Sequence, residues 1–161
     1  MRLFLDTNVL IDFMGERPSY YQQAATLFTL CAERRCDIVV SSLSMVTSNF
    51  ICCERCNIDL SVWTRKASMM KNIIEVAPVD ADEIFSSCDS EWNDYEDCVQ
   101  YKVAKNSVCD VIVTRNIRDF SLSDIPVLSP DEAIDIINST FCSDNSQNQD
   151  RSGQVTGHCP V

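Results

Sequence analysis

The stretch that decides the fold is residues 3–12, LFLDTNVLID. Its first three residues form a short apolar run, which ends at Asp6 and is followed by Thr7 and Asn8. A short apolar run bounded by polar residues is typical of a buried strand, and Asp, Thr and Asn are residue types that begin helices. The stretch therefore predicts a buried strand that runs directly into a helix, with a carboxylate at the junction.

The same alternation of short apolar strands and longer helices continues along the chain. Because strands separated by helices form parallel sheets that are covered on both faces, we expect an α/β fold with a central parallel sheet of four to five strands. After the strand at 3–5, the patterns predict strands at 38–40, 74–79, 111–113 and 125–128, and helices at 18–34, 41–53, 59–70, 80–88, 95–106 and 130–137.

The chain has 161 residues, of which 45% are hydrophobic, which suits one domain with a sizeable core. No apolar segment is long enough to span a membrane, and the first residues leave no room for a signal peptide, so we expect a soluble, cytoplasmic protein with no membrane partner. Beyond Thr140 the sequence becomes polar and has little to bury. We therefore expect a folded domain at 1–140 and a disordered polar tail at 141–161.

The chain is strongly acidic, with 24 Asp and Glu against 13 Lys and Arg and a net charge of −11. Proteins that hold nucleic acid by releasing counterions are normally basic, so the charge argues against tight non-specific binding of DNA or RNA. It does not argue against a site where cations lie between carboxylates and a phosphate, because the cations invert the local sign.

Ten cysteines are present, but they show no disulfide framework and several lie within apolar segments. We expect reduced thiols that pack in the core. The alternative is a zinc site at Cys53 and Cys56, which form a lone CxxC motif without a second pair at a matching spacing.

Acidic and amide side chains fall where the predicted strands end. Asp6 follows the first strand, Asp94 and Asp97 begin the helix before the fourth, and Asn116 and Asp119 follow the fourth. Functional groups gather at the carboxyl ends of the strands in an open parallel sheet, so we expect these acids to converge. Clustered carboxylates repel unless a cation joins them, and oxygen ligands without His or Cys select Mg²⁺ or Mn²⁺. Metal-assisted hydrolysis of a nucleic-acid backbone is the chemistry that such a site favours.

Each acid also has a local explanation. Asp6 can be a helix cap, residues 94–97 can be a solvated first helical turn, and Asp119 can be a turn residue. For Asp12 the sequence favours a side chain that faces solvent or bonds locally rather than one that binds metal. It is the joint placement of the other acids at strand ends that favours a metal site.

Three segments, at 3–12, 94–101 and 112–120, resemble in order and spacing the signature blocks of PIN domains, and residues 127–130 resemble the usual last strand and helix start. The resemblance covers about residues 1–138. It implies a Rossmann-like, three-layer α/β/α sandwich and a Mg²⁺- or Mn²⁺-dependent endoribonuclease, often the VapC-like toxin of a type II toxin–antitoxin pair. RNA would then be the substrate, an antitoxin protein a possible partner, and a homodimer the expected assembly.

The resemblance also implies roles for individual residues. Asp6, Asp97 and Asp119 would be metal ligands, and Asp94 would complete the catalytic carboxylates. Polar side chains that support these acids would be Thr7, Asn8, Thr47, Thr114 and Asn116.

One position departs from the usual pattern. Many PIN domains carry a glutamate in the helix after the second strand, whereas residues 41–48 here offer only hydroxyls, with Thr47 about where the acid would lie. A related subgroup carries asparagine there. Losing one carboxylate weakens the charge compensation of a bound ion, so a catalytically weak or inactive RNA-binding or scaffold module is the alternative function. A phosphatase is a more distant alternative, because Asp6-Thr7-Asn8 lacks the second Asp of a DxDx(T/V) motif.

Overall fold

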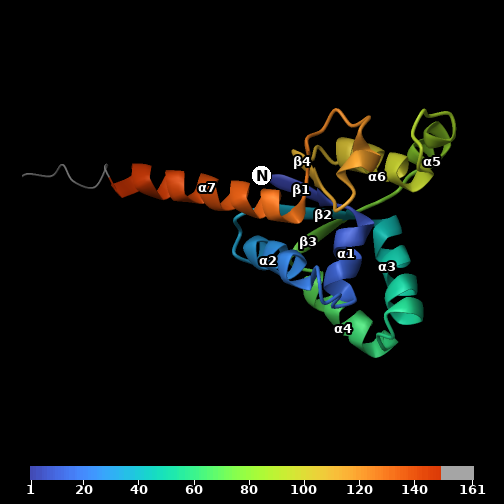
Figure 1. Ribbon diagram of the computed structural model, residues 1–161, viewed down its shortest axis with the longest axis horizontal. Coiled ribbons are helices and arrows are strands. Elements are labelled where there is room, and N and C mark those ends of the chain that lie inside the picture. The colour runs from blue at the N-terminus through green and yellow to red at the C-terminus, as the bar shows by residue number, and fades with distance from the viewer. Residues whose placement is uncertain (150–161) are drawn as a thin grey trace, which may run out of the picture.

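The computed structural model describes residues 1–149 and contains one sheet of five parallel strands in the order β3-β2-β1-β4-β5 (Figure 1). The strands are β1 (Arg2–Leu5), β2 (Asp37–Ser41), β3 (Ile74–Ala77), β4 (Val111–Val113) and β5 (Val127–Leu128). The helices are α1 (Thr7–Met14), α2 (Tyr21–Ala32), α3 (Ser42–Arg55), α4 (Leu60–Met70), α5 (Ala81–Cys88), α6 (Tyr95–Asn106), the 3₁₀ helix η1 (Ile117–Phe120) and α7 (Pro130–Gln149).

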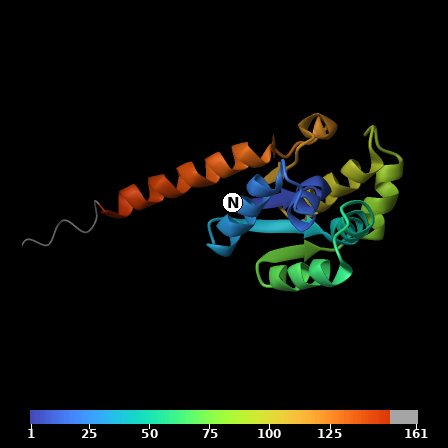
Figure 2. The ribbon, with the colours of Figure 1, turned by 60° about the horizontal axis from the view of Figure 1, so that its bottom comes forward.

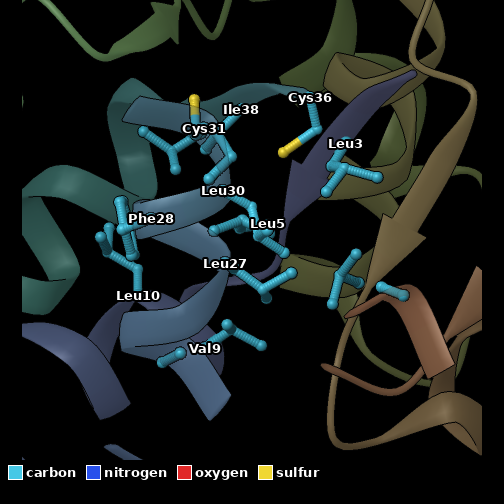
Figure 3. Close-up of a cluster of buried hydrophobic side chains, with 14 of the residues drawn as sticks. Leu3, Leu5, Val9, Leu10, Leu27, Phe28, Leu30, Cys31, Cys36 and Ile38 are labelled. Carbon is cyan, nitrogen blue, oxygen red and sulfur yellow. The ribbon is translucent and has the colours of Figure 1, made fainter. Parts of the chain in front are cut away.

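The central strand β1 shows why both faces of the sheet are covered. Successive side chains of a strand point to opposite faces. Leu3 and Leu5 join one apolar cluster, which also contains side chains of α2 and α7, whereas Phe4 joins a second cluster with α6. Figure 3 shows the first cluster, where Leu27 of α2 lies beside Leu5. The three-layer α/β/α arrangement expected from the sequence is therefore confirmed.

The ends of several elements differ from the prediction. Strand β3 ends at Ala77 rather than at residue 79, and β5 is confined to Val127–Leu128 because Pro126 has no N–H to donate to a neighbouring strand. Helix α7 continues to Gln149, past Thr140, where we expected the disordered tail to begin, since residues 141–149 contain no Gly or Pro to stop it. Figure 2 shows this helix extending away from the sheet. The rest of the predicted tail, 150–161, lies outside the described residues.

The eight cysteines whose side chains the structure describes are all free thiols, and five of them are buried, as expected for core residues. Within residues 1–149, no group of three His, Cys, Asp or Glu side chains could hold a metal ion by itself, and this includes the surroundings of Cys53 and Cys56. No helix in this part of the chain is long and apolar enough to cross a membrane.

Replacing Leu27 with Ala tests the first apolar cluster. Leu27 is fully buried between α2 and the sheet, so Leu27→Ala should lower the free energy of unfolding by about 2–5 kcal/mol, measured by urea denaturation. The matched control is Leu60→Ala, at a side chain that is 58% exposed, which should change it by less than about 0.5 kcal/mol. Equal effects of the two substitutions would contradict the packing described here.

Candidate functional site

The strand order indicates where on the sheet a functional site is expected. The chain runs outward from β1 to β2 and β3, then returns to the other side of β1 with β4 and β5. The order therefore reverses between β1 and β4, and ligands of open α/β sheets bind outside the carboxyl ends of the strands at such a switch point. Asp6 follows β1, and Thr114 follows β4. The Asp6 N–H donates to the Val113 carbonyl (3.0 Å), which fixes the two strand ends side by side.

Asp6 is buried at this point, with 4% of its surface exposed. It occupies the position before the first residue of α1, but its side chain does not cap that helix. Its Oδ2 instead accepts hydrogen bonds from the Asn8 side chain and from the Thr114 hydroxyl, the latter at 2.7 Å. Asn8 also donates to Thr114 Oγ1 (2.9 Å), so the three side chains hold one another. The helix-cap explanation of Asp6 therefore does not describe its side chain.

The surroundings of Asp6 disfavour its charge. Its pKa is raised to about 6, mainly because burial penalises the charged carboxylate and partly because the Glu96 carboxylate lies nearby. The Thr114 hydrogen bond acts in the opposite direction. An acid with a pKa near 6 at a strand end is a candidate functional group.

Helix α6 brings the second group of acids. Asp94 caps this helix, because its Oδ1 accepts from the N–H groups of Glu96 (2.8 Å) and Asp97 (3.3 Å). The pKa of Asp97 is raised to about 7, first by burial and then by the charges of Asp6, Asp94, Asp119 and Glu96. The carboxylates after β1, at the start of α6 and in η1 therefore all raise the pKa of Asp97.

Asp119 and Asn116 lie in the segment after β4. Asp119 belongs to η1, and its side chain is exposed, but its charge still raises the pKa of Asp97. The Asn116 N–H donates to Thr114 Oγ1 (3.0 Å), which ties the start of η1 to the residues that hold Asp6. The structure therefore brings Asp6, Asp94 and Asp119 within electrostatic range of Asp97.

A second hydrogen-bonded network lies beneath the acids and was missed in the sequence analysis. Gln100, which is fully buried, donates from Nε2 to Thr7 Oγ1 (2.9 Å) and Ser44 Oγ (3.0 Å). Thr7 in turn donates to Glu96 Oε1 (3.0 Å), and Ser44 also bonds the Ser41 hydroxyl (2.9 Å). The Thr7 hydroxyl therefore bonds Glu96 rather than the Asp6 carboxylate. The signal in the sequence was Glu96, an acid that lies between the predicted site residues Asp94 and Asp97.

Thr47 takes no part in this network. It is half-buried on α3, and its side chain makes no hydrogen bond within residues 1–149. The hydroxyl that α3 supplies next to Thr7 belongs to Ser44, one helical turn earlier.

Of the two options that the sequence left open for Asp12, the structure shows the local bond and not the solvent-facing side chain. It is buried, with 1% of its surface exposed, and its Oδ2 lies 2.7 Å from Nε of Arg115. Arg17 lies 3.4 Å from the other oxygen and supplies the local bond that the sequence suggested. Burial raises the pKa of Asp12, whereas the two arginines lower it. A buried carboxylate requires such a partner, and Arg115 comes from a segment about one hundred residues away.

The donor set can be tested against a divalent ion. No three carboxylates among the described residues form a closed cage, yet Mg²⁺ and Mn²⁺ keep several waters and need only one or two carboxylates. Asp6 and Asp97 are the candidate oxygen ligands, because burial and neighbouring carboxylates disfavour their charged forms and raise their pKa values, and a cation would offset both effects. The chemistry of these donors fits a hard divalent cation.

Comparison with known proteins identifies relatives in sequence and in fold. Ribonuclease VapC1 from Aquifex aeolicus (strain VF5) is 26% identical over 136 residues, which span 81% of this chain and 92% of that protein. In fold, the chain is similar to VapBC2 from Rickettsia felis bound to a promoter DNA fragment, with a TM-score of 0.57, 16% identity, and coverage of 80% of this chain and 98% of that one.

A second solved structure gives the same picture. Mycobacterium tuberculosis VapC20, a toxin that cleaves the sarcin-ricin loop, has a TM-score of 0.54 and 14% identity, with 68% of this chain and 86% of that one covered. The family profile described as PIN domain matches residues 2–118, which include β1, α6 and β4. A profile match over most of the chain, on a fold that gathers acids at the β1–β4 edge, shows that this chain belongs to the PIN-domain family.

Proposed function

We propose that this protein is a divalent-metal-dependent endoribonuclease that uses Mg²⁺ or Mn²⁺ to hydrolyse RNA phosphodiester bonds. The observation that carries the proposal is the meeting of Asp6, Asp97 and Asp119, which belong to remote segments, at the switch point of a PIN fold. Carboxylates held together at a cost in free energy are favourable when a cation joins them. The curated relative, a ribonuclease, favours RNA over other phosphodiesters.

The chain's own residues have distinct tasks in this proposal. Asp6, Asp97 and the exposed Asp119 would hold the ion. Asn8 and Thr114 fix the Asp6 carboxylate, and Asp94 fixes the start of α6 and therefore the position of Asp97. A divalent cation bound there supplies positive charge to the scissile phosphate and makes a water molecule more acidic.

We further propose that the protein acts as the toxin of a type II toxin–antitoxin pair. The fold neighbours include VapBC2 and the toxin VapC20. An acidic site suits an arginine of a protein antitoxin, which would pair with the carboxylates and compete with the metal. A homodimer and a cytoplasmic location remain predictions of the family resemblance.

The alternative, an RNA-binding or scaffold module without catalysis, rests on two observations. The resemblance to PIN domains implies a glutamate near Thr47 that this sequence lacks, and the described residues hold no ready-made group of three metal ligands. The two functions differ in whether bound RNA is cut, so a cleavage assay separates them.

Replacing Asp97 with Asn should abolish cleavage, because it removes the carboxylate on which the other charges act. Metal-dependent cleavage of single-stranded RNA, measured as initial rate with Mn²⁺, should fall by roughly 100-fold or more in Asp97→Asn and in Asp6→Asn. Asp89→Asn, at an exposed acid after α5, should keep the wild-type rate. Wild-type protein that binds RNA but leaves it uncut in the presence of Mn²⁺ would contradict the enzyme and favour the scaffold.

The raised pKa of Asp97 predicts how stability depends on pH without metal. This pKa is about 7 in the folded protein, against 3.8 for an ordinary exposed Asp, which represents the unfolded chain. The folded protein therefore holds the proton more tightly, and its free energy of unfolding falls as pH rises from about 4 to 7. Asp97→Asn lacks this loss. Its midpoint of thermal unfolding in EDTA should match that of wild type near pH 4 and exceed it by a few degrees near pH 8.

With Mn²⁺ in place of EDTA, the wild type should have the higher midpoint of thermal unfolding near pH 8. The ion stabilises the folded wild type by binding to it and binds Asp97→Asn weakly. Asp89→Asn serves as the control, with a difference from wild type that does not change with pH. Parallel pH profiles for wild type and Asp97→Asn would show that Asp97 is not under the electrostatic repulsion described here.

A further inference from the structure

A cavity of about 400 Å³ lies beside the acid cluster, which is the size of a small-molecule site. It is built where α1, α2, the segment after β4 and the start of α7 meet. Arg115 and Asn116 line both this cavity and the adjoining surface hollow that contains Asp119. A ligand in the cavity would therefore lie next to the proposed cleavage site.

Arg115 is the most constrained side chain in this cavity. Its Nε lies 2.7 Å from the buried Asp12 carboxylate, and its guanidinium stacks over the Tyr20 ring at 4.2 Å from the centroid. Its backbone N–H donates to Asn8 Oδ1 (3.3 Å), so the residue is also held from the side of the acid cluster. The two Nη atoms have no partner within residues 1–149. Because Arg115 lines the cavity, its Nη groups can serve as donors to a ligand that binds there.

Helix α7 and the segment that leads into α2 supply hydrogen-bond acceptors to the cavity. Asp131, in the first turn of α7, lines the same cavity and has no hydrogen bond or ion pair within the described residues. The Gln23 amide and the Ser19 hydroxyl also line it, and neither has a partner there. The charges of Arg17 and Arg115 are balanced by Asp12 and Asp131. A neutral ligand with both donors and acceptors therefore suits this cavity better than a phosphate anion does.

We propose that this cavity binds a guanine base of the RNA substrate, in a nucleotide next to the scissile phosphate. Guanine presents O6 and N7 as acceptors, the pattern that a pair of arginine donors recognises, and its N1–H and N2–H₂ groups can donate to the Asp131 carboxylate. Adenine carries an amino group where guanine has O6, which places a donor against the Arg115 donors. Tyr20 adds an aromatic surface at the mouth. The inference rests on the proposed ribonuclease function, and it names the residues that would give it base specificity.

The first experiment measures nucleotide binding without catalysis. Titration of the full chain with 5′-GMP and 5′-AMP in EDTA, followed by NMR shifts of backbone amides, should show GMP bound roughly tenfold more tightly, with shifts at residues 19–24 and at Ser129 and Asp131. Because both nucleotides carry the same phosphate, the difference reports the base. Asp131→Asn should remove the preference, whereas Asp135→Asn, one turn further along α7, should retain it.

The second experiment places the contact within RNA. Cleavage sites in a mixed-sequence RNA are mapped, and the guanosine beside a site is replaced with inosine, which lacks the N2 amino group. The replacement should slow cleavage by wild-type protein roughly tenfold and have little effect on Asp131→Asn, because the two changes remove the same contact. Gln23→Ala should weaken binding of guanine-containing RNA, and Gln22→Ala, exposed on the same helix and outside the cavity, should not.

The outcomes separate this inference from the proposed function. Equal binding of GMP and AMP, or cleavage that ignores the neighbouring base, would overturn the guanine site while metal-dependent cleavage still stood. Selective GMP binding without any cleavage would overturn the enzyme and retain the base site. Protection of residues 19–24 and 129–131 by a protein partner, with no response to nucleotides, would assign the cavity to that partner and overturn the inference.

Discussion

The constraint on which the site depends is the burial of Asp6 beside the partly buried acids of α6, at the carboxyl ends of β1 and β4. Burial is the main cause that raises the pKa values of Asp6 and Asp97, and the neighbouring carboxylates add to it. That costs free energy, which the two apolar clusters on either side of the sheet offset. A bound cation would lower this cost, which is the physical basis of the proposed metal site.

Two polar networks keep the acids in place, and they differ in how completely their hydrogen-bonding groups are satisfied. Around Asp6, the bonds from Asn8 and Thr114 give the carboxylate its partners. Beneath it, the Gln100 side-chain NH₂ donates to Thr7 and Ser44, but its Oε1 is buried without a hydrogen bond among the described residues. An unsatisfied buried oxygen costs about 1–3 kcal/mol, and proteins accept such costs mainly at functional sites.

Asp12 and Arg115 connect the acid site to the cavity next to it. Asp12 lies inside α1 and fixes Arg115, which follows β4 and bonds Asn8 through its backbone. The same residue therefore borders the acids on one side and the cavity on the other. Since Asn8 also holds Asp6, a ligand that contacts Arg115 lies two hydrogen-bonded residues from the proposed metal ligand.

The sequence by itself determined the strands, most helix bounds and the presence of acids at strand ends, because strand and helix patterns are local and the carboxyl ends of parallel strands share one edge. It also carried the family resemblance through residues 3–12, 94–101 and 112–120. The partners of Asp12, Ser44 and Gln100 were decided only by the tertiary structure. These contacts join segments far apart in the chain, and they depend on how α1, α3 and α6 pack, which no local periodicity specifies.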